Sequence, residues 1–228
     1  MARQLWIGGG VGFALGALGG MSSLGRDFRA ALTAASGSTV NKGTVRDASD
    51  AVACAEDIIH ASRTRHPASA CMLGTVLADG DGSAVPKPRL RPINPMQVEL
   101  GGARPHVLFN TNTKSRKFQQ LSENPSASLV YLDADGIGYV NLIGTAERLP
   151  PDEAVQQWEA RQLAFYPEGH AEGKGRFSVW RLNPTRMELI SVRLGVDSAS
   201  HNDWRPLACD WVDGAWVLDE FTVPDSST

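Results

Sequence analysis

Cysteine and net positive charge are the two properties that this sequence most clearly lacks. The three cysteines, Cys54, Cys71 and Cys209, lie far apart and form no C-x-x-C pair, which argues against a disulfide framework and a zinc knuckle. The formal net charge is -3 at pH 7, whereas a protein that coats nucleic acid is normally basic, so we expect no nucleic-acid partner. The 5 histidines show no metal-ligand spacing, and we expect no metal site.

Charge is also missing from one stretch near the N-terminus, where no charged residue occurs between Arg3 and Arg26. Residues 5–24 (LWIGGGVGFALGALGGMSSL) are apolar and glycine-rich, and their length is close to the roughly 20 residues that cross a bilayer. Residues 1–46 contain many Ser and Thr and more basic than acidic residues, which is typical of a targeting segment. Three alternatives stay open: a membrane anchor, an organelle-targeting segment, or a flexible tail on an otherwise cytoplasmic protein.

The rest of the chain, residues 47–228, has the pattern of many short strands and few helices. This pattern favours a barrel or sandwich over a doubly wound sheet. Ser49 or Asp50 is expected to cap the first helix, and Asp213-Gly214 is a hairpin turn signal. The sequence predicts helices over residues 47–65, 114–123 and 150–165, and strands over residues 70–78, 89–94, 106–110, 127–132, 138–148, 177–182, 187–192, 207–212 and 215–218.

Positive charge is concentrated in one segment of this acidic chain. Residues 87–117 contain seven Lys and Arg but one acid, Glu99. The run Phe109–Lys117 (FNTNTKSRK) follows a predicted strand and opens a predicted helix. Unpaired backbone N–H groups and the helix dipole favour an anion at such a helix N-terminus. The run therefore indicates either a phosphate site, which Arg89 or Arg91 on the neighbouring strand would complete, or a capped surface helix with solvated lysines.

The segment Phe109–Pro125 (FNTNTKSRKFQQLSENP) resembles the pyridoxamine 5′-phosphate oxidase-like family of FMN-binding split barrels. Its pattern is Thr-Asn, two spacers and Ser-Arg-Lys before a helix that ends in Asn-Pro. Gly144–Leu149 (GTAERL) is a second match, and residues 180–188 contain a third. The resemblance covers roughly residues 50–221. It implies a mainly β fold with flanking helices, a six-stranded split β-barrel in residues 47–228, and a homodimer with FMN at its interface.

The resemblance implies which residues of this chain hold the FMN phosphate. Ser115, Arg116 and Lys117 match the phosphate-binding residues of the family. Arg91 matches a strand arginine that contacts FMN.

Four further residues correspond to positions near the flavin. Asn110 and Thr111 match the pair beside the ring. Tyr139 falls where many members have Gln, and Arg205 matches a late arginine of the family.

The substrate side departs from the family pattern. Pyridoxamine-phosphate oxidases carry Arg-x-Val-Leu-Leu-Lys in the early strand, whereas Arg91–Met96 reads RPINPM and has no Lys. A Tyr and an Arg that bind the substrate phosphate correspond to Gln157 and Arg161, so the Tyr is absent.

The sequence therefore predicts a flavoprotein oxidoreductase that acts on an unidentified small molecule. The flavin ring carries the hydride or electron chemistry, and no side chain is assigned as catalytic. Two alternatives remain: a barrel that binds flavin or haem without turnover, and an authentic pyridoxamine 5′-phosphate oxidase.

Overall fold

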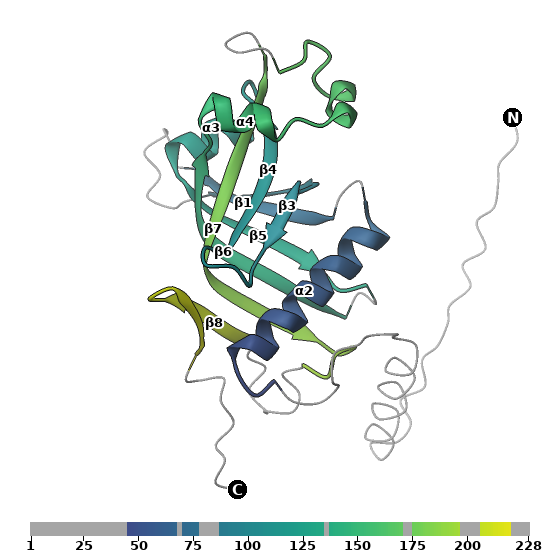
Figure 1. Ribbon diagram of the computed structural model, residues 1–228, viewed down its shortest axis with the longest axis vertical. Helices are drawn as coiled ribbons and strands as arrows, with labels where there is room; N and C mark the ends of the chain where they lie inside the picture. The colour runs from purple at the N-terminus through teal and green to yellow at the C-terminus, as the bar shows by residue number, and fades with distance from the viewer. Residues whose placement is uncertain are drawn as a thin grey trace, which may run out of the picture.

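The computed structural model describes residues 45–67, 70–77, 87–134, 137–170, 175–196 and 206–219. One antiparallel sheet forms most of this part of the chain, and helix α2 (Ala48–Arg65) lies across it (Figure 1). The apolar head and Arg205 lie outside the described residues, so the expectations for them stay predictions. Within the described ranges, no helix is long and apolar enough to span a membrane.

The strands follow one another in the sheet in the order β2-β1-β5-β6-β7-β4-β3, with β8 paired to β7 and β9 to β8. Among the described strands, six contain seven or more residues. They are β1 (Cys71–Leu77), β2 (Lys87–Ile93), β4 (His106–Asn112), β5 (Ser126–Leu132), β6 (Gly138–Arg148) and β7 (Phe177–Ser191). The shorter strands are β3 (Gln97–Glu99), β8 (Leu207–Val212) and β9 (Ala215–Leu218), and the remaining helices are α3 (Arg116–Glu123), α4 (Pro151–Gln156) and the 3₁₀ helix η1 (Ala160–Ala164).

Strand β7 corrects one expectation, because the two strands predicted over residues 177–182 and 187–192 are a single strand. Its register against β6 shifts between Ile143 and Gly144, and Thr185 is the extra residue of a β-bulge. A Cβ atom at Gly144 would lie 2.1 Å from the Asn183 carbonyl oxygen. Only glycine therefore fits there. The bulge also accommodates Pro184, which reads in sequence as a strand break.

The helix predicted over residues 150–165 is also wrong as one element. Helix α4 ends at Gln156, and Glu159 has an extended backbone (φ -122, ψ 144) before η1 begins. The Glu159 N–H donates to Gln162 Oε1 at 3.0 Å. This cap begins η1 as a separate helix after the extended residue Glu159. As a result Leu163 of η1 is 51% exposed.

Helix α2 supplies one wall of the hydrophobic core. Asp47 caps it by accepting a hydrogen bond from the Asp50 N–H at 2.9 Å, rather than Ser49 or Asp50 as expected. Its buried face carries small and β-branched side chains that pack on the sheet: Ala51, Cys54, Ala55, Ile58 and Ile59.

The cysteines belong to the same core. Burial raises the pKa of Cys71 and Cys209 to about 12. These thiols therefore stay protonated at neutral pH and act as packing groups.

A buried network of charged groups joins α2 to the residues at the C-terminal ends of β5 and β7. Arg193, 8% exposed, pairs with Asp57 of α2 at 2.5 Å and with Asp133 at 2.8 Å. Asp133 also accepts a hydrogen bond from the Ser191 hydroxyl at 2.5 Å. The Ser191 Oγ in turn accepts a hydrogen bond from the Leu194 N–H at 3.1 Å. We call Arg193, Asp57, Asp133 and Ser191 the Arg193 network; in it, two carboxylates neutralise one buried guanidinium.

Candidate functional site

The connection between β4 and α3 is held in one conformation by its own side chains. Ser115 caps α3 by accepting a hydrogen bond from the Phe118 N–H at 3.3 Å, and its Oγ lies 3.0 Å from Thr111 Oγ1. The Thr111 carbonyl accepts from Ser178 Oγ of β7 at 2.8 Å. The fully buried Thr111 and the half-buried Ser115 therefore lie side by side at the N-terminus of α3.

Arg91 reaches the same helix from strand β2. Its Nη2 donates to Thr75 Oγ1 at 2.7 Å and to Gln120 Oε1 at 2.6 Å. Thr75 and Gln120 are themselves hydrogen-bonded at 2.9 Å, and both are buried. The guanidinium is thus oriented by two neutral oxygens, which leaves its charge uncompensated.

Lys117, on the first turn of α3, adds a second positive charge. Burial lowers the pKa of Lys117, and the nearby charge of Arg91 lowers it further. Burial likewise lowers the pKa of Arg91, with a further contribution from Arg89. No carboxylate in the described ranges forms an ion pair with Arg91, Arg116 or Lys117.

The electrostatics of these groups favour a negatively charged ligand. Arg91 and Lys117 are partly desolvated cations beside a capped helix N-terminus, and no described acidic group pairs with them, so an anion would stabilise them. We call the following residues the α3 site: Thr75, Arg91, Thr111, Ser115, Lys117 and Gln120. Sequence reasoning missed Thr75 and Gln120, because no local pattern marks a threonine and a glutamine that meet only through packing.

The remaining sequence-predicted residues are placed differently. Arg116 is the first residue of α3, between Ser115 and Lys117, and it is exposed. Asn110 precedes Thr111 on β4, is half-buried, and accepts a hydrogen bond from the Tyr166 hydroxyl at 3.2 Å.

Tyr139 is not brought to the α3 site within one chain. In the sheet, Thr75 lies level with Ala127 and Gly144. Tyr139 is five residues from Gly144 along β6, or about 17 Å at the usual rise of a strand. Burial raises the pKa of its hydroxyl, and Glu188 raises it further.

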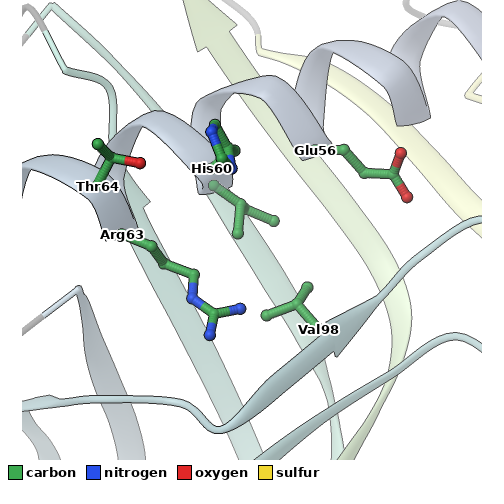
Figure 2. Close-up of a pocket in the computed structure, with 6 residues that line it drawn as sticks. Glu56, His60, Arg63, Thr64 and Val98 are labelled. Atoms are coloured by element: carbon green, nitrogen blue, oxygen red, sulfur yellow. The ribbon is translucent and has the colours of Figure 1, made fainter. Parts of the chain in front are cut away.

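A separate groove of about 410 Å³ lies between α2 and β3 (Figure 2). Ile59 and Val98 provide apolar surface in it, while His60, Arg63 and Glu56 line it from α2. The groove contains none of the sequence-predicted site residues, and Arg63 donates to the Met96 carbonyl at 3.2 Å. Across the described ranges, no three His, Cys, Asp or Glu side chains gather in a way that could hold a metal ion.

Comparison with known proteins defines the class. The family model described as pyridoxamine 5′-phosphate oxidase matches residues 60–191, more than half of the chain. The chain therefore belongs to the pyridoxamine 5′-phosphate oxidase family.

Two curated relatives match over shorter segments. A pyridoxine/pyridoxamine 5′-phosphate oxidase of Salinibacter ruber is 43% identical over 53 residues, which cover 23% of this chain and 25% of that protein. A provisionally named pyridoxamine 5′-phosphate oxidase of Caenorhabditis elegans is 33% identical over 75 residues, or 33% of each chain. The chain thus spans only a quarter to a third of the length of these relatives.

A solved structure agrees on the fold. The pyridoxamine 5′-phosphate oxidase-related, FMN-binding protein of Nostoc punctiforme superposes with a TM-score of 0.50 at 16% sequence identity, covering 78% of this chain and 98% of that one. The expected mainly β split-barrel fold is confirmed.

Proposed function

We propose that this protein is an FMN-dependent oxidoreductase that acts on a small molecule as a homodimer with FMN at its interface. The observation that carries the proposal is the α3 site, where Arg91 and Lys117 bring two charges together without a described carboxylate partner. A phosphate monoester carries about two negative charges and several acceptor oxygens near neutral pH. It therefore complements this site better than a carboxylate with one charge does.

The residues present fit the phosphate of FMN. Lys117 and the free N–H groups of the Arg91 guanidinium would donate charge-assisted hydrogen bonds to it. The Thr111 and Ser115 hydroxyls and the N-terminus of α3 supply neutral donors beside them. When bound, FMN supplies the hydride or electron chemistry.

The protein's own contribution is binding and orientation. Thr75 and Gln120 hold the Arg91 guanidinium in one position before any ligand arrives, which reduces the entropy lost on binding. The Ser178 hydroxyl and the cap at Ser115 fix the β4–α3 connection in the same way. Asn110 would face the ring side of the flavin.

The homodimer accounts for Tyr139. Because Tyr139 lies about 17 Å along the sheet from the level of the α3 site, it contributes to that site only if a second copy supplies it. Arg205, which lies outside the described residues, is proposed on the resemblance alone.

One position on the substrate side, that of the family's substrate lysine, differs in this chain. At the position of the family's substrate lysine the chain has Met96, which packs against the apolar cluster of Leu108, Leu149, Ala154 and Val179. A half-buried thioether offers no charge to a second phosphate, so Met96 does not support pyridoxamine phosphate as the substrate.

The deciding experiment is spectroscopic. The full chain is purified and its visible spectrum recorded, and added FMN is titrated while its fluorescence is followed. We expect a flavin spectrum or saturable quenching at micromolar FMN; the absence of both would overturn the proposal. A haem spectrum would favour the alternative cofactor.

A second measurement separates an enzyme from a binding protein. The FMN-loaded protein is mixed anaerobically with NADPH, or aerobically with pyridoxamine phosphate, and flavin reduction or pyridoxal phosphate formation is followed. Reduction by NADPH with transfer to an acceptor supports an oxidoreductase, and pyridoxal phosphate formation identifies an authentic oxidase of that substrate. Bound FMN that neither compound reduces would favour storage or sensing.

A further inference from the structure

Four aromatic rings pack against one another around Tyr166, whose hydroxyl contacts Asn110 of β4. The Trp158 ring centroid lies 5.0 Å from those of His170 and Phe177, and 6.3 Å from that of Tyr166. Tyr166 and Phe177 meet edge to face at 5.3 Å. We call Trp158, Tyr166, His170 and Phe177 the aromatic cluster.

After η1, the chain buries Tyr166, whose ring carries a hydroxyl, and leaves the fully apolar ring of Phe165 exposed. Tyr166 is 4% exposed, whereas Phe165 is 77% exposed. Burial of apolar area alone would favour Phe165, because a buried tyrosine hydroxyl needs a partner. That partner is Asn110 Oδ1, which accepts from the Tyr166 hydroxyl at 3.2 Å.

The Tyr166 hydroxyl is the donor in this hydrogen bond, and Asn110 Oδ1 is the acceptor. Burial raises the pKa of Tyr166 to about 12, and Glu168 adds to the effect. The hydroxyl therefore keeps its proton at neutral pH, as its donor role requires. With its oxygen held in this way, the Asn110 side chain turns its NH₂ group away from Tyr166, and no acceptor in the described part of the chain is paired with that group.

The support behind Tyr166 is itself rigid. The Tyr166 N–H donates to the Gln162 carbonyl at 2.9 Å, and the Gln162 side chain is buried and engages the Glu159 N–H. The break between α4 and η1, which the sequence did not predict, is what directs Tyr166 back onto β4.

We propose that Tyr166 is a positioning residue that orients the Asn110 amide as a hydrogen-bond donor toward the flavin ring. The inference rests on the proposed function, because the ring side of the site is defined there. Tyr166 acts through Asn110 and does not itself contact the cofactor in this assignment.

The test is Tyr166→Phe in the full chain, which keeps the ring packing and removes only the hydroxyl. FMN affinity is measured by fluorescence titration, and the visible band and midpoint potential of bound FMN are recorded. Because one neutral hydrogen bond is disturbed, we expect affinity to fall about three- to tenfold, with a shifted band and potential. Tyr131→Phe is the matched control, since it removes the hydroxyl of another fully buried tyrosine in the core; it should change none of these readouts.

A double-mutant cycle shows whether the effect passes through the amide. Asn110→Ala should weaken FMN binding at least as much as Tyr166→Phe does, and the double variant should match Asn110→Ala alone. Wild-type affinity and spectrum in Tyr166→Phe, or in Asn110→Ala if Tyr166→Phe folds poorly, would overturn the inference. So would additive effects in the cycle. A wild-type protein that binds no FMN would overturn the proposed function and this inference together, and is recognised before any variant is made.

Discussion

The Arg193 network and the α3 site use the same kind of side chain for opposite purposes. Arg193 is almost fully buried and is neutralised by Asp57 and Asp133. Arg91 is less buried, and among the described residues only the neutral oxygens of Thr75 and Gln120 accept its hydrogen bonds. A compensated buried cation holds elements together, whereas an uncompensated one keeps its charge available for a ligand. The difference lies in the partners that the fold provides for each guanidinium.

Among the substitutions that test this comparison, we expect the largest effect on stability from replacing Arg193. Arg193→Met leaves Asp133 buried without its cation, so we expect the free energy of unfolding to drop by about 3–5 kcal/mol. Denaturant unfolding of the purified protein measures it. Arg104→Met is the control, because the Arg104–Glu147 pair is exposed and its loss should cost less than about 1 kcal/mol. Equal effects in the two variants would mean that burial of the network contributes nothing.

The next effect concerns binding and not stability. Lys117→Ala should weaken FMN binding by about 1.5–3 kcal/mol, the range for a hydrogen bond to a charged group, while unfolding changes little or shifts toward greater stability. Fluorescence titration and thermal unfolding test both statements. Lys114→Ala removes the same charge from an exposed position three residues earlier and should leave affinity nearly unchanged. A loss of affinity in Lys114→Ala equal to that in Lys117→Ala would point to general attraction of the phosphate by positive charge.

The smallest effect is a pH dependence. In the free protein the pKa of Lys117 lies below its ordinary value, and a bound phosphate dianion raises it again. FMN affinity should therefore fall as pH rises above the pKa of the free protein, by at most about tenfold per pH unit for one proton. Titrations at several pH values in wild type and Lys117→Met test this, since the variant should lose that part of the slope. In the absence of FMN the sign is reversed: with a depressed lysine pKa the unfolded state holds more protons, so stability rises with pH between the folded and unfolded pKa values of Lys117.

The sequence was most informative where the physical cause is local. The bounds predicted for β6 are those found, because alternating residues lie between a glycine-containing turn and a Pro-Pro pair. The hairpin at Asp213-Gly214 follows for the same reason: both residues adopt positive φ, 50° and 84°, which that dipeptide tolerates. The cap at Ser115 lies within four residues of the groups it contacts.

The sequence was least informative where two distant segments decide the outcome. The strand predicted to end at residue 182 continues, because a bulge opposite Gly144 carries β7 past Pro184. Thr75 and Gln120 are 45 positions apart and meet only because β1, β2 and α3 pack together. Tyr166 and Asn110 are separated by 56 positions, and the restart at η1 brings them within hydrogen-bonding distance.

The class of fold, the position of helix α3 and the family to which the chain belongs could all be predicted from the amino-acid sequence. Each of these depends on spacing within a short segment, where chain connectivity already limits the geometry. Only the tertiary structure decided which positive charges are compensated. Arg116 and Lys117 are adjacent in the sequence, yet one is exposed and the other is half-buried beside Arg91. A pKa depends on what surrounds a group in three dimensions, and in this protein those surroundings come from strands and helices far apart along the chain.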